Sequence, residues 1–206
     1  MRLDPQAFFY RRVEALGDIV FGVAMTMLVY DVPLHDRLSA APTLSEIWDV
    51  DGQTLTALGL SFAVGMMFWL SHHRRLALAR HNGGFEFVVT AAFLLSIACL
   101  PLTTSLYGIK GAAGDVLTVY SSHLAIIALL NVFLWLMAWY SKADMTEPVA
   151  ANLLIPPIIS FVILAAAAVT SLWSSDLPQI LMYAAFLSPL SEHLARRVHR
   201  TDKQQG

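Results

Sequence analysis

The chain has little charge and almost no cysteine. Only 14% of its 206 residues are charged, against roughly 25% in a soluble domain. The single cysteine, Cys99, excludes a disulfide or a cysteine metal site within one chain. Hydrophobic residues instead make up 57% of the sequence, and the mean hydropathy is +0.61. Apolar runs near 20 residues recur along the whole length, which indicates a polytopic helical membrane protein.

The familiar patterns of enzyme active sites are also missing. The sequence contains no nucleotide-binding loop, catalytic triad, HExxH helix or paired-carboxylate arrangement. We therefore expect a protein that is not an enzyme, with no cofactor, no metal site and no nucleic-acid partner. The net charge of −2 predicts no partner by itself, because the distribution of charge matters more than its sum.

Six membrane-spanning helices are predicted, all in one all-α domain over residues 1–198, followed by a disordered cytoplasmic tail over 199–206. The first span ends at Pro33, and Pro189 interrupts the last. The first apolar run follows Arg11 and Arg12 as a signal peptide would, but it is too long and contains Asp18, so we interpret it as a retained span. The predicted spans are 15–32, 55–71, 85–108, 116–140, 149–173 and 177–194.

The distribution of basic residues predicts the orientation of the spans. With the N-terminus inside, the outer segments hold two basic residues, Arg37 and Lys110, and the inner segments hold the other eleven of the 13. An even number of spans then places both termini in the cytoplasm of a multi-pass protein of the bacterial inner membrane. The inner basic residues are Arg2, Arg11, Arg12, Arg74, Arg75, Arg80, Lys142, Arg196, Arg197, Arg200 and Lys203.

The first outer segment is acidic and contains a helix-start pattern. Its carboxylates either raise the local cation concentration at an outer mouth or form an ordinary solvated loop. The run from Thr43 to Glu46 fits a capping box, which predicts a short separate helix over the membrane surface. The acidic residues are Asp31, Asp36, Glu46, Asp49 and Asp51.

The first span carries a charge where lipid penalises one. Asp18 lies about a turn inside the span, so it needs a partner. We expect it to pair with Arg12 or to accept amides at the helix N-terminus, since the helix dipole favours an anion there. Asp18 and Gly22 lead toward a stripe at positions i, i+4 and i+7 formed by Val23, Met27 and Tyr30, with Thr26 beside it. The spacing alone leaves open whether this stripe packs or lines a pore.

The second span ends in an aromatic and basic cluster, from Phe68-Trp69 to Arg75. Adjacent histidines lie about 100° apart on a helix, so His72 and His73 suit a shared metal poorly. The cluster is typical of a basic interfacial collar under an aromatic belt. A proton-sensing role for His72 or His73 is the alternative. The remaining polar residues of the spans are expected to be interhelical or interfacial groups: Glu86, His123, Asn131, Glu192 and His193.

Three motifs together resemble those of the bacterial homologues of the lysosomal potassium channel, transmembrane protein 175. The family's Arg-x-x-x-Phe-Ser-Asp matches Arg12-Val-Glu-Ala-Leu16-Gly17-Asp18, with Leu and Gly in place of Phe and Ser. The ends of the second and third spans also look like the family: Ser61-Phe62 with Trp69-x-x-His72-His73-Arg74, and Leu100-Pro101 with Thr104-Ser105-Leu106-Tyr107-Gly108. The resemblance covers essentially the full chain.

The resemblance implies a homotetramer in which the first span of each subunit lines a central pore for potassium and other monovalent cations. Bulky apolar side chains form the constriction in this family, and they correspond to Val23, Met27 and Tyr30, with Thr26 as the hydroxyl associated with cation preference. Arg12, Leu16, Gly17 and Asp18 would anchor the helix. A ring of tyrosines seals less completely than a ring of leucines, so modest selectivity is expected.

Two other functions compete with the channel. One is a proton-coupled secondary transporter or proton leak pathway that uses Asp18, His72 or Glu192 as relay groups. The lack of inverted repeats and of a clearly broken helix pair argues against it. The other is a structural or assembly membrane protein without transport.

Overall fold

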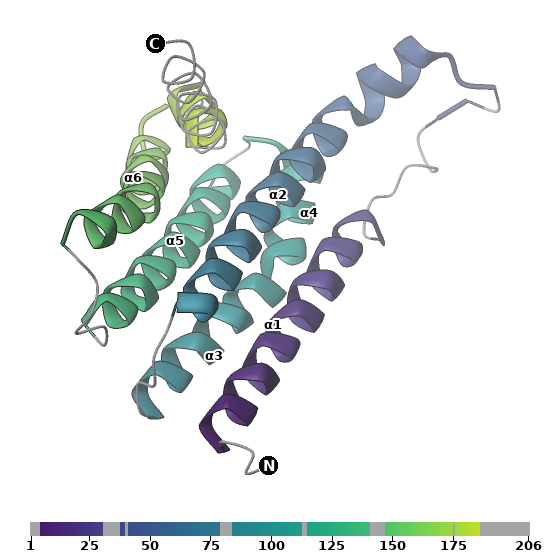
Figure 1. The fold of residues 1–206 in the computed structure, drawn as a ribbon. Coiled ribbons are helices and arrows are strands. Elements are labelled where there is room, and N and C mark those ends of the chain that lie inside the picture. Colours follow the sequence, from purple (N-terminus) through teal and green to yellow (C-terminus); the bar gives the residue numbers. More distant parts are fainter. Residues whose placement is uncertain are drawn as a thin grey trace, which may run out of the picture.

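The computed structural model of the chain describes residues 5–30, 38–39, 41–78, 84–112, 115–140, 147–174 and 176–185. These residues form helices and no strand, which confirms the all-α prediction. Successive spans run in alternating directions through one bundle (Figure 1). The elements are α1 Pro5–Tyr30, α2 Leu44–Leu78, α3 Gly84–Ala98, α4 Leu100–Lys110, α5 Val116–Tyr140 and α6 Glu147–Thr170, and a further helical stretch covers 176–185.

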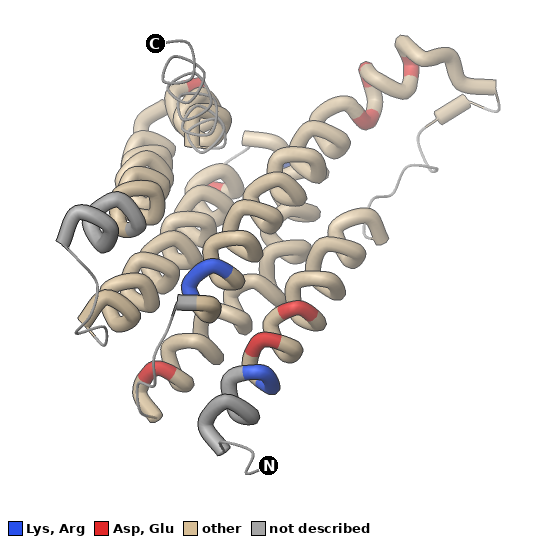
Figure 2. Tube along the Cα trace, viewed as in Figure 1, with Lys and Arg blue, Asp and Glu red and all other residues tan. Residues whose placement is uncertain are grey.

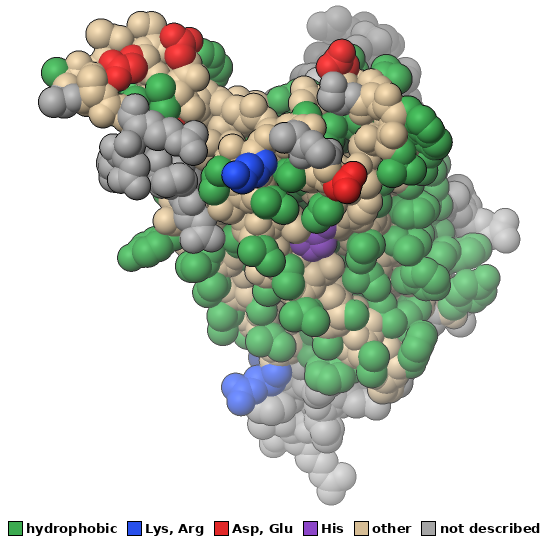
Figure 3. All heavy atoms as spheres, turned by 180° about the vertical axis from the view of Figure 1, so that it is seen from behind, with side chains coloured by type: hydrophobic (Ala, Val, Ile, Leu, Met, Phe, Trp, Pro, Cys, Tyr) green, Lys and Arg blue, Asp and Glu red, His purple; other side chains and the backbone are tan. Residues whose placement is uncertain are grey.

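Four helical segments among the described residues are long and apolar enough to cross a membrane. A fifth apolar helix, Leu154–Thr170, is shorter. Hydrophobic side chains cover most of the face seen in Figure 3, and charged side chains lie toward its two ends, as a lipid-facing surface requires. The chain is therefore a membrane protein. The four segments are Arg11–Tyr30, Leu44–Ala77, Gly84–Lys110 and Val116–Tyr140.

The second span is longer than predicted. Thr43 Oγ1 accepts the Glu46 amide at 3.3 Å and starts a helix, as the capping pattern indicates. The predicted separation of this helix from the second span is wrong, because α2 continues unbroken for 35 residues. At 1.5 Å per residue it is about 52 Å long, and its acidic N-terminal end stands clear of the bundle (Figures 1 and 2).

The third span is broken. The predicted span 85–108 lies within the membrane-crossing segment Gly84–Lys110. Its helix is interrupted at Cys99, where α3 has ended at Ala98 and α4 begins at Leu100. Pro101 causes the break, since it lacks an N–H and its ring crowds the carbonyl of Ile97 four residues earlier. By contrast, α6 continues through Pro156 and Pro157, and α5 matches its predicted bounds of 116–140.

Boundaries at the two ends of the chain differ more. Helix α1 begins at Pro5, ten residues before the predicted start of the first span. The helical stretch 176–185 agrees with the start of the predicted sixth span. Several residues of the predictions lie outside the described residues: Asp31, Pro33, Asp36, Arg37, Pro189, Glu192, His193 and the tail 199–206.

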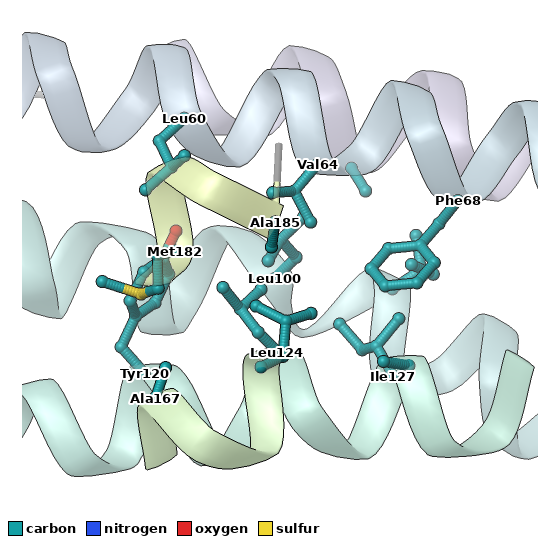
Figure 4. Packing of buried hydrophobic residues seen from close by; sticks show 14 of the residues in the cluster. Leu60, Val64, Phe68, Leu100, Tyr120, Leu124, Ile127, Ala167, Met182 and Ala185 are labelled. Atoms are coloured by element: carbon teal, nitrogen blue, oxygen red, sulfur yellow. The ribbon is translucent and has the colours of Figure 1, made fainter. Parts of the chain in front are cut away.

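The core lies where α2, α4, α5 and α6 meet. Leu60, Val64 and Phe68 of α2 point toward Leu124 and Ile127 of α5 (Figure 4). Ala167 of α6 and Met182 of the last helical stretch close the other side of this core. Helix α1 packs against α2, α3 and α4 at the edge of the bundle. It is therefore supported on one side only.

Candidate pore helix and its anchors

One side of α1 is buried against the bundle. Its buried residues recur at helical spacing as Val13, Gly17, Phe21, Ala24 and Leu28. Phe21 is fully buried and packs its ring against Phe93 of α3, with ring centroids 6.0 Å apart. These residues fix which side of α1 faces the bundle and which side is left outward.

The predicted stripe lies on the outward side of α1. The exposed fraction is 55% for Val23, 42% for Met27 and 86% for Tyr30. Leu16 and Ile19 extend this apolar surface toward the N-terminal end. Thr26 is exposed beside the stripe, and its hydroxyl lies 2.8 Å from the Val23 carbonyl and 3.0 Å from that of Gly22. The hydroxyl hydrogen is thus donated within the helix, which leaves the oxygen lone pairs directed outward.

Asp18 is held by a residue that the sequence analysis did not pair with it. Trp69 Nε1 donates to Asp18 Oδ1 at 2.9 Å. The helix N-terminal amides are out of reach, because α1 begins at Pro5, more than three turns earlier. Nor does Asp18 lead into the stripe, since five residues rotate a helix by about 140° and turn Asp18 from Val23 toward α2. Arg12 is exposed on α1, six residues before Asp18.

The backbone of α1 lies close to the His72 ring of α2 at Gly17. A Cβ added at Gly17 would lie 2.8 Å from His72 Nε2 and 3.1 Å from its Cδ2. No side chain fits there unless the imidazole moves. The glycine in the motif therefore has a physical reason in this chain: it admits the His72 ring against the α1 backbone.

His72 belongs to a buried charged cluster. Arg75 Nη1 donates to Glu86 Oε1 of α3 at 2.8 Å, and both side chains are almost completely buried. Arg75 Nη2 lies 3.3 Å from His72 Nδ1. A guanidinium can only donate, so Nδ1 accepts and the neutral ring carries its hydrogen on Nε2, directed at Gly17. Predicting Arg75 and His72 as members of an exposed basic collar is wrong, because the carboxylate of Glu86 draws the guanidinium inward.

His73 and Arg74 are exposed and fit the predicted collar. His73 stacks on Trp69, with ring centroids 5.7 Å apart. Its Nδ1 lies 3.4 Å from Glu14 Oε1 of α1. Two polar contacts thus join the contact of Gly17 with His72 in connecting α1 to α2 at this end: Asp18 with Trp69, and Glu14 with His73. Among the described residues, no group of three His, Cys, Asp or Glu side chains is arranged to hold a metal ion.

Sequence reasoning missed the anchoring roles of Trp69, Arg75 and Glu86. Trp69 was assigned to an aromatic belt, and its partner lies 51 residues away. The pairing of Arg75 with Glu86 could have been predicted, because these opposite charges lie 11 residues apart across a short connection between two apolar spans. Of the acidic residues predicted to lie in the first outer segment, Glu46 accepts the amide and hydroxyl of Ser39 at 2.8 and 2.9 Å. Asp51 is buried in α2.

Comparison with known proteins identifies relatives of this arrangement. Residues 12–101 match the family model described as the endosomal/lysosomal potassium channel TMEM175. The matched range begins at Arg12 of the first motif and ends at Pro101, where the third span breaks. It therefore contains nearly all of α1 that faces the bundle and the whole of α2.

Two comparisons extend beyond this range. A protein of Chamaesiphon minutus named as a potassium channel is 30% identical over 129 residues, which span 60% of this chain and 63% of that protein's length. A crystal structure described as a lysosomal potassium-selective channel TMEM175 homolog from Chamaesiphon minutus superposes with a TM-score of 0.75 at 20% identity. It covers 87% of this chain and 95% of that one.

The resemblance drawn from the sequence is thereby confirmed. At 20% identity the superposition establishes the fold, and the sequence match establishes the relationship over its own residues. Residues 12–101 are similar in sequence to the TMEM175 potassium channels, and the chain has the fold of a TMEM175 homolog over most of its length.

Proposed function

We propose that the chain forms a potassium-permeable cation channel in which four copies of α1 surround a central pore. The observation that carries this proposal is the outward stripe of α1. Val23, Met27 and Tyr30 are 55%, 42% and 86% exposed in a helix whose other side is fixed to the bundle. The potassium-channel relatives and the shared fold support the choice of ion.

The stripe would act as a hydrophobic constriction. Rings of Val, Met and Tyr around an axis narrow a water-filled path, and such a ring closes a channel by dewetting. The backbone carbonyls of α1 are engaged in the helix, so side chains would have to form the barrier. Thr26 would supply the outward-facing hydroxyl oxygens beside it, since its hydrogen is donated to backbone carbonyls. Polar oxygen beside a hydrophobic ring favours a partly dehydrated cation.

The orientation in a bacterial inner membrane follows from charge. Arg11 and Arg12 of α1 lie near Arg74 and Arg75 of α2, at the end where Glu14 contacts His73. Lys110 lies at the other end, where Gly108 of α4 contacts Thr54 of α2. We place the Arg-rich end in the cytoplasm under the positive-inside rule. The acidic N-terminal end of α2 would then face outward, where Asp49 attracts cations toward the pore.

A proton-coupled transporter or proton leak is the competing function. The break at Cys99 removes one argument against it, since one span is interrupted among the described residues. A liposome flux assay separates the two. Potassium flux far faster than a transporter's turnover supports the channel, and flux that strictly requires a proton gradient would contradict it.

The pore assignment is tested by replacing Met27. We expect Met27→Ala to increase single-channel conductance, because a smaller side chain widens a ring around the axis. Met66→Ala is the matched control, since Met66 on α2 is 39% exposed and Met27 is 42% exposed. If Met27→Ala and Met66→Ala had the same single-channel conductance, Met27 would not be part of the constriction.

Native mass spectrometry in detergent tests the assembly. A mass of four 22.7 kDa subunits is expected, and a functional dimer would exclude the fourfold ring.

A further inference from the structure

The broken third span has a side chain from another helix at its break. Backbone groups freed by a proline inside a membrane need a partner, because lipid supplies none. Here α3 ends at Ala98, Cys99 joins the two helices, and Pro101 stands in the first turn of α4. The ring of His123, from α5, lies against this junction.

His123 contacts both sides of the break. Its Nε2 is 3.0 Å from the carbonyl oxygen of Ser96, in α3. Its Nδ1 is 2.8 Å from Oγ1 of Thr103, in α4. A carbonyl oxygen can only accept, so Nε2 carries the hydrogen. In the neutral ring Nδ1 then accepts from the Thr103 hydroxyl, for which it is a nearer acceptor at 2.8 Å than the Leu100 carbonyl at 3.2 Å. One ring therefore bridges the last turn of α3 and the first turn of α4.

We propose that His123 is a positioning residue that clamps the break and sets the angle between α3 and α4. Pro101 removes the hydrogen bond to the Ile97 carbonyl that would continue the helix across the junction, whereas the Cys99 amide still donates to the Leu95 carbonyl at 3.1 Å. The two ring nitrogens replace that constraint with contacts to one fixed point on α5. The ring is planar and rigid, so its two contacts determine the separation of Ser96 from Thr103.

The angle matters because α4 reaches the pore helix. A Cβ added at Gly65 of α2 would lie 3.5 Å from Met25 of α1 and 3.8 Å from Leu100 of α4. Three helices thus meet at Gly65, and the α4 residue at this meeting point, Leu100, directly follows the break at Cys99. Farther along α4, Thr104 donates to Ser61 of α2 at 2.8 Å. A change in the clamp would move α4 relative to both α1 and α2.

The proposal predicts a difference between two substitutions of similar size. His123→Phe keeps a flat ring for packing but makes neither hydrogen bond. His123→Gln has less ring-like packing but retains a donor and an acceptor. If hydrogen bonding is what holds the break, Gln preserves the wild-type conformation and Phe does not. If the ring only fills space, the order is reversed.

Cys99 provides the reporter. It is the only cysteine, it lies at the break, and it is exposed. We would attach a trifluoromethyl tag to this thiol in the full chain in lipid nanodiscs and record ¹⁹F NMR spectra. One dominant resonance is expected for the wild type and for His123→Gln. His123→Phe should populate a second resonance, with the ratio of the two conformers shifted about threefold to tenfold, as for the loss of an interhelical hydrogen bond in a membrane.

Two further variants complete the test. Thr103→Val keeps the His123 ring and removes the Nδ1 contact, together with the longer 3.2 Å contact between the Thr103 hydroxyl and the Leu100 carbonyl of the same helix. It should shift the ratio in the same direction by a smaller factor. This variant also tests the clamp if His123→Phe does not fold. Val119→Ala, one turn from His123 on the exposed part of α5, is the control and should leave the spectrum unchanged. The proposal would be overturned if Thr103→Val and His123→Phe both gave the wild-type spectrum. It would also be overturned if His123→Phe and His123→Gln shifted the ratio of the two resonances equally. The readout does not depend on ion flux.

Discussion

The two sides of α1 differ in what determines their residues. The bundle-facing side is held by specific contacts: Gly17 admits the His72 ring, and Phe21 packs against Phe93. The outward side, with Val23 and Met27, is exposed among the described residues of one copy of the chain. The first side therefore reports on folding, and the second reports on what the helix does after folding. Substitutions on the two sides should affect different measurements.

The largest loss of stability is expected at the buried Arg75–Glu86 ion pair, because Arg75 also contacts His72, which packs against the bundle-facing side of α1. Arg75→Met leaves the Glu86 carboxylate without its guanidinium in a nearly dry site. We expect the free energy of unfolding to fall by about 3–5 kcal/mol, measured by SDS titration in mixed micelles. Replacing both partners, Arg75→Met with Glu86→Leu, should recover most of that loss. Arg74→Met, at an exposed position one residue earlier, is the control. An equal loss from the Arg74 and Arg75 variants would contradict a structural role for the buried pair.

A smaller effect is expected at the glycine contact. Gly17→Ala places a methyl group 2.8 Å from His72 Nε2, and we expect a loss of about 1–3 kcal/mol from overpacking. Gly22→Ala is the matched control, because nothing lies within 4 Å of its added Cβ. That change should stabilise the helix by up to about 1 kcal/mol.

Gly17→Ser sharpens this comparison. Its hydroxyl can accept the Nε2 hydrogen of His72, so part of the loss seen with alanine should be recovered. The same SDS titration measures all three variants. If Gly17→Ala proved as stable as Gly22→Ala, the close approach of His72 to α1 would be wrong.

The smallest effect on folding is expected on the outward side. Val23→Ala should change the free energy of unfolding by less than about 0.5 kcal/mol. Val64→Ala, in the core of α2, should cost about 1–2 kcal/mol. In liposome flux the order should be reversed, with a change for Val23→Ala and little change for Val64→Ala. A large loss of stability from Val23→Ala without any change in flux would assign the outward side to packing between subunits.

Local patterns predicted the elements well and the partners poorly. Hydrophobic length gave α5 at its observed bounds, and helical spacing placed Val23, Met27 and Tyr30 on one outward side. Pro101 is a signal for the break at Cys99, but a proline does not decide it alone, because α6 continues through Pro156 and Pro157. Whether Arg75 turns inward or outward depends on the position of Glu86 after a chain reversal, which no local rule supplies. Trp69 and Asp18 likewise meet only once α1 and α2 are packed.

The unbroken length of α2 has a mechanical consequence. The helix runs from Leu44 to Leu78, and its last turns carry the Trp69 and His73 side chains that contact α1. Tilting a rigid rod of about 52 Å by about 5° moves one end relative to the other by about 4–5 Å. A protein or ion that grips the projecting end around Asp49 would thus pull on α1 from the opposite surface. The helix is a lever whose shorter, N-terminal arm stands outside the bundle.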